Sequence, residues 1–337
     1  MRHLMRFLVM GVASVAAMTA SAAGPSEPPV PHNAGLPPAW AYVPIPPAAP
    51  ADPNAPKPAP DTTPKRVPHS DVALTLAQIR DLHDPPDWHP DDHPPMPEIV
   101  GRGRKPGIFA CAYCHLPNGQ GRPENAGLAG LPAAYIVQQM ADFKSGARKS
   151  AVPKLVPIMM MLNVAANAHE DDIVVAAEYF ASLRFKPWIK VVESDTAPKT
   201  RVGGAMLVAL EDGSREPIGA RIIEVPENLT ATELRDSKSG FIAYVPKGSL
   251  KKGEALALTG NKGRVTACVA CHGADLQGLG PVPPLAGRSP SYIVRQLYDL
   301  RSGARAGAWS PLMKNIVAAM SDDDILNVAA YAASRAP

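Results

Sequence analysis

Two stretches of the chain place apolar side chains at helical spacing. From Tyr135 to Phe143 they recur at i, i+3 and i+4, and Ser145-Gly146 ends the pattern. A second helix is predicted to begin at Glu170 and to present one apolar face as far as Phe180. Helices this short do not form a stable core alone, so the pattern indicates a small helical unit that needs further apolar mass.

The same pattern returns later in the chain. Residues 287–296 match 130–139, and residues 299–305 match 142–148, at an offset of 157 positions. The offset then falls to 152, so the first copy carries five extra residues between Arg148 and Met161. In the second copy the final helix is predicted to start at Ser321, with Asp324 completing a capping box. Such self-similarity indicates two copies of one structural unit.

Between the two copies the periodicity changes from helical to alternating. Four short segments are predicted strands, and Glu211-Asp-Gly213 is a turn signal. A small β-rich insertion is therefore expected, followed by the opening helix of the second unit, Ser249–Leu258, which ends at Gly260. The predicted strands are Trp188–Val192, Ala205–Leu210, Arg221–Val225 and Phe241–Val245.

Composition sets the N-terminal region apart. The chain has 337 residues and 39 prolines, and 16 of the prolines fall between residues 25 and 68. Such a sequence cannot bury a core, and we expect an extended, partly polyproline spacer. It would extend the reach of the folded body or tether it, or alternatively wrap around it. Asp71–Asp81 is expected to add a short helix.

The first residues have the features of an export signal. Arg2 and Arg6 precede a short apolar run, and Ala20-Ser21-Ala22 is an A-x-A cleavage site. The run is too brief for a membrane anchor. We expect cleavage near Ala22 or Ala23 and a mature protein that works in the periplasm of a bacterium.

Charge and hydropathy disfavour two classes of protein. The formal net charge is +3, which gives no electrostatic reason to wrap nucleic acid. After residue 20 the sequence contains no apolar stretch long enough to span a bilayer. We therefore expect neither a nucleic-acid-binding protein nor an integral membrane protein.

All four cysteines lie in two copies of one motif, Cys111-Ala-Tyr-Cys114-His115 and Cys268-Val-Ala-Cys271-His272. C-x-x-C-H attaches haem c: two thiols one helical turn apart each add to a vinyl group, and the histidine reaches the iron from the same side. Local disulfides leave the histidines unexplained, and a zinc site needs ligands from both clusters. A thioredoxin-like redox pair of cysteines would lie beside a βαβ pattern, which the sequence lacks. The motifs predict two covalently bound haems c, with His115 and His272 as iron ligands.

The second axial ligand of each iron is expected on the loop before the last helix of each unit. Met161 precedes Ile173 by 12 residues, and Met313 precedes Ile325 by the same 12. A thioether is a soft ligand that suits haem iron, and a Met/His pair raises the reduction potential. The alternative is that these methionines only fill core space.

In the first unit the choice of methionine stays open. Met159, Met160 and Met161 are adjacent, and the five-residue insertion blurs the register. Met159 is the chief rival of Met161, because Pro157-Ile-Met159 echoes Pro311-Leu-Met313.

The other histidines carry weaker signals. His83, His89 and His93 lie among aspartates, which is a composition that can bind a metal. Prolines from Pro85 to Pro95 favour an irregular surface segment instead. His169 stands at a predicted helix start and is interpreted as a solvated cap residue.

Together these motifs resemble the exported class I cytochromes c, specifically the tandem two-haem kind. The two C-x-x-C-H motifs with Met161 and Met313 carry the resemblance, as do the terminal helices that end Tyr179-Phe-Ala-Ser-Leu183 and Tyr331-Ala-Ala-Ser334. The resemblance covers residues 98–184 and 248–336 and implies the all-α cytochrome c fold and one-electron transfer through partly exposed haem edges. Family members serve periplasmic dehydrogenases, quinol-oxidising complexes or terminal oxidases.

The insertion and the arm depart from the compact tandem pattern, so we expect the two units to stand further apart.

We therefore predict a mainly α protein with two cytochrome c-type haem domains in tandem, a β-rich insertion between them and a proline-rich N-terminal arm. The expected divisions are a signal peptide at 1–23, the arm at 24–70, the first haem domain at 71–184, the insertion at 185–247 and the second haem domain at 248–337.

The predicted function is to carry single electrons between a dehydrogenase or quinol-oxidising donor and an oxidase or other acceptor. The partners would be redox proteins, with a membrane-bound respiratory complex among the candidates, and no catalytic residue is expected. Two alternatives stay open. One is a dihaem enzyme, peroxidase-like or sulfur-compound oxidising, with one open iron. The other is a cytochrome subunit of a larger dehydrogenase.

Overall fold

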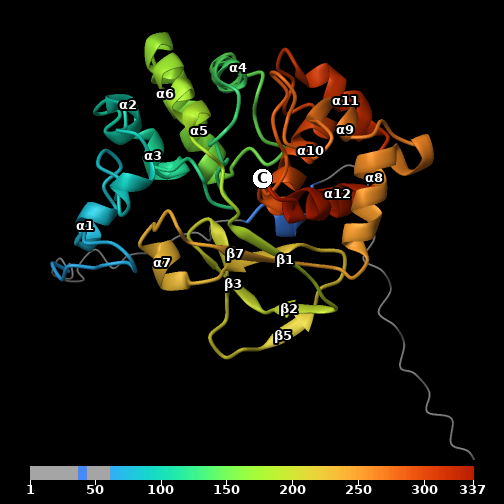
Figure 1. The fold of residues 1–337 in the computed structure, drawn as a ribbon, viewed down its shortest axis with the longest axis horizontal. Helices are drawn as coiled ribbons and strands as arrows, with labels where there is room; N and C mark the ends of the chain where they lie inside the picture. The colour runs from blue at the N-terminus through green and yellow to red at the C-terminus, as the bar shows by residue number, and fades with distance from the viewer. Residues whose placement is uncertain (1–36, 44–60) are drawn as a thin grey trace, which may run out of the picture. The chain divides into compact units, whose positions relative to one another are not determined.

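The computed structural model describes residues 37–43 and 61–337 (Figure 1). The predicted signal peptide, 1–23, and much of the proline-rich arm lie outside the described residues. Among the residues described, one set of helices precedes a β-rich insertion and a second set follows it, so the predicted mainly α class with a β-rich insertion is confirmed. These residues contain no helix that is both long and apolar enough to cross a membrane.

The helices of the first unit surround a core built on the predicted apolar faces. Ile136, Ile173 and Phe180 are all buried there. The last helix carries Glu170, Asp171 and Asp172 in its first turn, where acids suit the helix dipole. The helices are α2 (Glu98–Gly101), α3 (Cys111–His115), α4 (Ala133–Lys144), α5 (Val156–Asn167) and α6 (Glu170–Ser182).

The second unit repeats this arrangement, and its opening and closing helices pack closely. A Cβ at Gly253 would lie 2.1 Å from the carbonyl oxygen of Asn327, so only glycine allows this contact. The predicted capping box of Ser321 and Asp324 is confirmed. The right-handed portion of the first helix ends at Gly260, where φ is +62°, as predicted. The helices are α8 (Ser249–Gly263), α9 (Val269–His272), α10 (Pro290–Ser302), α11 (Ser310–Ala318) and α12 (Asp322–Ser334).

The insertion holds one three-stranded sheet and two two-stranded sheets, β2 with β5 and β3 with β4, coloured yellow-green to orange in Figure 1. In the sheet the central strand β7 pairs in parallel with β1, in the register Ile189↔Phe241, and antiparallel with β6, in the register Ile223↔Tyr244. All four predicted strands are present, whereas β2, β3, β5 and the short helix α7 (Leu229–Glu233) were not predicted. The strands are β1 (Ile189–Glu193), β2 (Thr196–Pro198), β3 (Thr200–Gly203), β4 (Met206–Ala209), β5 (Arg215–Pro217), β6 (Ile223–Pro226) and β7 (Phe241–Val245).

The N-terminal part of the first unit, before α2, packs against the insertion. Trp88 is 2% exposed, and its Nε1 donates to the carbonyl of Leu234 at 2.8 Å. The helix expected over Asp71–Asp81 is shorter than predicted: α1 spans only Leu76–Ile79, between a capping box at Thr75 and a turn. A second short element is the 3-10 helix η2 (Pro90–Asp92).

One described piece of the arm is not a spacer. Ala41 and Tyr42 are buried, and the Tyr42 hydroxyl donates to Asp299 Oδ1 at 3.0 Å beside the 3-10 helix η1 (Ala39–Ala41). For this stretch the extended spacer is wrong and the alternative, an arm that wraps the folded body, agrees with the contacts. Trp40 and Tyr42 are an aromatic pair that can anchor to the body, which the proline content of the arm does not reveal.

The expectation that the units stand apart is also wrong. The backbone of Lys149 donates to Ala304 and that of Ala306 to Ala147, each at 2.7 Å, so the two units touch directly. The physical reason lies in the insertion, whose first strand β1 pairs with its last strand β7. The chain therefore returns beside the point where it left the first unit, and the insertion does not lengthen the connection.

A candidate two-haem site

One continuous cavity connects the two motifs. Its volume is about 810 Å³, a size typical of cofactor sites. Its walls are mainly apolar and come from both units, including Phe180, Leu297 and Ile316. The structure thus brings the two C-x-x-C-H segments, 157 positions apart in the chain, to one site.

Each motif forms one turn of helix at the cavity wall. Cys111 and Cys114 lie on α3, and Cys268 caps the start of α9, which contains Cys271. All four are free thiols, so the local disulfides considered above do not form here. Burial raises the pKa of Cys111 to about 12 and that of Cys268 to about 11. Burial thus favours the neutral thiol form at these two positions, the form that adds to a vinyl group.

The two histidines are held in the same way. His115 Nδ1 lies 2.8 Å from the carbonyl oxygen of Ala126, and His272 Nδ1 lies 2.8 Å from that of Pro283. A carbonyl accepts only from a protonated nitrogen, so Nδ1 carries the hydrogen and Nε2 keeps its lone pair. Burial lowers the pKa of both rings, which also favours the neutral form. Each imidazole is thereby prepared to bind a metal through Nε2.

The candidate methionines separate into two groups. Met160, Met161 and Met313 line the cavity, and all three are half-buried. Met159 is 51% exposed and is not among the cavity-lining residues. The geometry therefore favours Met160 or Met161 over Met159 as the thioether that reaches the first motif's side of the cavity.

The methionines are not on loops, as the sequence led us to expect. Met161 lies inside α5 and Met313 inside α11. Each helix has a proline in its first turn, Pro157 and Pro311, where the missing N–H costs nothing. These prolines suggested a loop in the sequence, but here they begin helices.

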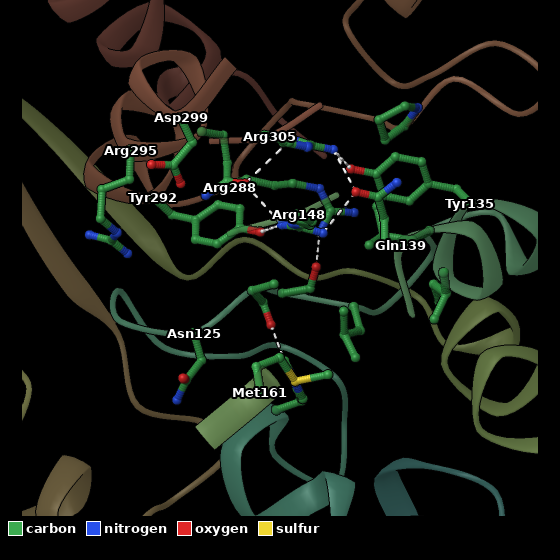
Figure 2. A pocket seen from close by; sticks show the side chains of 18 of the residues that line it. Asn125, Tyr135, Gln139, Arg148, Met161, Arg288, Tyr292, Arg295, Asp299 and Arg305 are labelled. Carbon is green, nitrogen blue, oxygen red and sulfur yellow. Dashed lines mark hydrogen bonds between the residues drawn. The ribbon is translucent and has the colours of Figure 1, made fainter. Parts of the chain in front are cut away.

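The cavity has an excess of positive charge. Among the described residues its walls include six arginines but only three acids, Glu124, Asp172 and Asp299. Figure 2 shows Arg148, Arg288 and Arg305 converging at the boundary between the units. The Nε atoms of Arg235 and Arg305 are buried without a hydrogen-bond acceptor, whereas Arg122 Nε lies 3.0 Å from Glu124 Oε1. An uncompensated group of buried cations calls for an anionic ligand.

Equivalent residues of the two units exchange hydrogen bonds across this boundary (Figure 2). Arg148 donates to the Tyr292 hydroxyl at 3.1 Å, and Arg305 donates to the Tyr135 hydroxyl at 2.7 Å. Gln139 Oε1 accepts from both arginines, at 2.9 Å each. Arg148 Nη2 also donates to Gln296 Oε1 at 2.9 Å.

Sequence reasoning missed these boundary residues as site residues. Their signal was present, since Tyr135, Gln139 and Arg148 recur at an offset of 157 as Tyr292, Gln296 and Arg305. Arg235 and Arg288 also reach the cavity, and no pattern in the sequence pointed to them.

The three N-terminal histidines have other partners. His89 Nε2 lies 3.0 Å from Asp236 Oδ1, and His93 Nε2 lies 3.1 Å from Asp87 Oδ1. His83 Nδ1 contacts the carbonyl of Arg102. His169 is the exposed N-cap residue of α6 and makes no side-chain capping bond. The described residues contain no cluster of three or more His, Cys, Asp or Glu side chains placed to hold a metal ion.

The residues present fit haem c. Each motif offers two free thiols for the two vinyl groups and one imidazole with a free Nε2. The apolar walls suit a porphyrin ring, and the unpartnered arginine N–H groups suit its propionate carboxylates.

The chain is similar to proteins of the cytochrome c family. The family profile described as Cytochrome c matches residues 251–335. The chain is 32% identical over 237 residues to the thiosulfate dehydrogenase electron acceptor of Stutzerimonas stutzeri (strain A1501), covering 69% of this chain and 82% of that protein. It is 26% identical over 237 residues to cytochrome c4 of Azotobacter vinelandii, covering 69% and 86%. The solved thiosulfate dehydrogenase of Marichromatium purpuratum aligns with a TM-score of 0.44 and 27% identity, over 68% of this chain and 37% of that one.

The fold and the site define a c-type cytochrome with two attachment motifs. The chain belongs to the family of tandem two-haem class I cytochromes c. It carries two covalently bound haems c and takes part in electron transfer.

Proposed function

We propose that this protein is a periplasmic carrier of single electrons between a dehydrogenase or quinol-oxidising donor and an oxidase or other acceptor. Bound haem c supplies one-electron redox chemistry at its iron. The observation that carries the proposal is that each domain brings a C-x-x-C-H motif and a methionine to a cavity shared by both. A shared cavity favours passage of an electron from one domain to the other.

The geometry supports the proposed ligands, and Met161 is preferred to Met160 because it precedes Ile173 by the same 12 residues by which Met313 precedes Ile325. We assign Cys111, Cys114, His115 and Met161 to the first haem, and Cys268, Cys271, His272 and Met313 to the second. The carbonyls of Ala126 and Pro283 orient the histidines, and the helical settings of Met161 and Met313 hold the thioethers. A fixed His/Met pair lets the iron change charge with little movement of its ligands.

The methionines weigh against the dihaem enzyme. An enzyme of that kind needs one iron with an open position, whereas both domains present thioethers to the cavity. The divisions at 71–184, 185–247 and 248–337 are proposed on the same basis, since each outer division would supply its own complete set of ligands.

A sulfur-compound dehydrogenase is the donor that the relatives favour. Two similar proteins carry the name thiosulfate dehydrogenase electron acceptor, from Stutzerimonas stutzeri and Thiomonas intermedia. By analogy we propose a thiosulfate dehydrogenase as the donor, either as a diffusing partner or as the fixed catalytic subunit of a complex. The periplasmic location is proposed from the signal-like first residues, which place haem attachment outside the cytoplasm.

The experiment mixes the oxidised holoprotein with thiosulfate in the presence and absence of a purified thiosulfate dehydrogenase. We expect the haem absorbance to change to that of the reduced form, with two electrons taken up per chain, only when the dehydrogenase is present. Reduction by thiosulfate alone, or consumption of peroxide by the protein alone, would instead support an enzyme. Co-purification of the two proteins separates a fixed subunit from a diffusing carrier.

A further inference from the structure

The two attachment faces are built alike but differ in exposure. In each domain the loop after the motif folds back on it: Gly121 N donates to the carbonyl of His115 at 3.0 Å, and Gly278 N to that of His272 at 2.7 Å. The positions that follow are equivalent at the offset of 157, and there Arg122 is 8% exposed whereas Leu279 is 62% exposed. The same loop position is thus interior in one domain and surface in the other.

The difference extends over the whole face. Gln120 is 3% exposed, whereas its equivalent Gln277 is exposed. Cys114 is half-buried, whereas its equivalent Cys271 is exposed. Because the local folds match, the cause must be what lies on top of the first face.

Residues 186–237, within the β-rich insertion and the segment that leads into it, supply that cover. Asn118 Nδ2 donates to the carbonyl of Ser237 at 2.8 Å, and Gln120 Nε2 to that of Lys186 at 2.6 Å. Met206 Sδ lies 3.3 Å from Arg122 Nη2. These contacts join three separate points within residues 186–237 to one loop of the first domain.

Arg235 completes the cover directly over the motif. Its guanidinium carbon lies 4.0 Å from the ring centroid of Tyr113, the residue before Cys114, and it also donates to the Tyr113 carbonyl. The backbone of Arg235 has a φ of +60°, an unfavourable value for arginine, so the surrounding contacts must hold it there. Arg235 lines the same cavity as the motif.

Among the described residues the second face has no comparable cover. Ala270, Cys271, Gln277, Leu279 and Pro281 are all exposed there. Within 270–281 the one charged side chain is that of Asp275. A surface this poor in charge fits a partner that presents an uncharged surface around its own redox cofactor.

We propose that electrons enter and leave the protein through the attachment face of the second domain, at Cys271 and Leu279, and that the first domain exchanges electrons only through the second. The occupant of this face is a redox protein with an uncharged contact surface. The inference rests on the proposed carrier function. It adds the route of the electrons within the protein, because the insertion covers one of two equivalent contact faces.

The first test measures access without turnover. A neutral gadolinium chelate is added to the oxidised holoprotein, and broadening of the haem methyl resonances is recorded by NMR. We expect the methyl resonances of one haem to broaden and those of the other to stay sharp. The broadened resonances should be the ones whose chemical shifts change in Leu279→Phe, which identifies them as those of the second domain. Equal broadening of both sets, or broadening of the other set, would overturn the proposal.

The second test measures the route of electrons with a small cationic reductant, hexaammineruthenium(II), at low ionic strength. Leu279→Lys should slow reduction and Leu279→Glu should speed it, each about two- to five-fold. The change in rate should apply to the absorbance change of both haems and not to half of it. The matched control Glu233→Lys places a charge on the exposed end of α7, on the cover, and should change neither phase.

If half of the absorbance change is insensitive to the charge at Leu279, the first domain has its own route and the proposal is wrong. The same conclusion follows if neither half responds, or if Glu233→Lys alters one half. Failure of the carrier function itself would look different, as carbon monoxide binding by the reduced wild type, which does not depend on Leu279.

Discussion

Arg148 and Arg305 lie opposite each other across the domain boundary, as partners in an antiparallel backbone bridge. They occupy equivalent positions of the two domains, and each donates a hydrogen bond to the tyrosine of the other domain. Each domain therefore completes the polar network of its neighbour, and we expect the two domains to unfold together.

Arg148→Ala tests this coupling. The change removes three hydrogen bonds, to Tyr292, Gln296 and Gln139, and leaves the Tyr292 hydroxyl without the Arg148 donor, while Arg305 still donates to the two glutamines. We expect a loss of about 2–4 kcal/mol in the free energy of unfolding, measured in urea on the holoprotein. Arg201→Ala, at an exposed position of β3, is the control and should cost about 0.5 kcal/mol or less. Equal effects of the two changes, or two separate transitions in the wild type, would contradict the coupling.

Trp88 anchors residues 61–97, which precede α2, to the insertion. Trp88→Phe removes the donor to the Leu234 carbonyl and should cost about 1–3 kcal/mol. Trp88→Ala also empties a buried site and should cost about 3–5 kcal/mol. Urea unfolding gives both values, and limited proteolysis should cut Trp88→Ala between residues 61 and 97 before any other described segment. Resistance of this segment in Trp88→Ala would show that the indole is not its anchor.

His93 gives the protein a pH-dependent contribution to stability. The hydrogen bond to the Asp87 carboxylate raises the pKa of His93 above its usual 6.5, against the opposing effect of burial. A raised pKa in the folded state means that the stabilisation is fully present below about pH 6.5 and is lost as the pH rises through the folded value. The difference in unfolding free energy between wild type and His93→Asn should therefore be largest at acidic pH and shrink on the alkaline side. A difference that grows with pH would contradict this assignment.

Arg235 is expected to tune the first haem. A fixed positive charge beside Tyr113 favours the reduced iron, which carries one positive charge less. Arg235→Gln should lower one of the two reduction potentials by an energy of about 1 kcal/mol per electron and leave the other unchanged. Spectroelectrochemical titration measures both potentials, with Arg201→Gln as the control. A shift of neither potential would show that Arg235 acts only as a cover, and an equal shift of both would contradict its assignment to the first haem.

The repeat and the two motifs made much of the fold predictable. Cys111 and Cys268 fixed the offset of 157, and with it the helices that follow each motif. Helix α12 was predicted down to its capping box, because Ser321 and Asp324 interact within one turn. These features depend on residues close together in the sequence, or on comparison of one copy with the other.

Contacts between distant segments were not predictable in this way. Tyr42 anchors to Asp299 although the surrounding composition indicates a spacer, and β1 pairs with β7 across the whole insertion. Arg235 reaches the cavity from a position without an equivalent in either repeat. Each of these depends on the three-dimensional path of the chain, which local periodicity does not contain. The methionine helices were missed for a local reason, because Pro157 and Pro311 suit a helix start as well as a loop.

The most direct test of the account is the visible and near-infrared spectrum of the oxidised holoprotein and of three variants, with carbon monoxide added after reduction. The account predicts two methionine-ligated low-spin haems in the wild type, which carbon monoxide leaves unchanged. Met161→Ala and Met313→Ala should each remove one methionine signal and open one iron to carbon monoxide, whereas Met159→Ala, at an exposed position, should match the wild type. A wild-type haem that is already high-spin and binds carbon monoxide would contradict the carrier function, and an unchanged spectrum in Met161→Ala would contradict the assigned ligand.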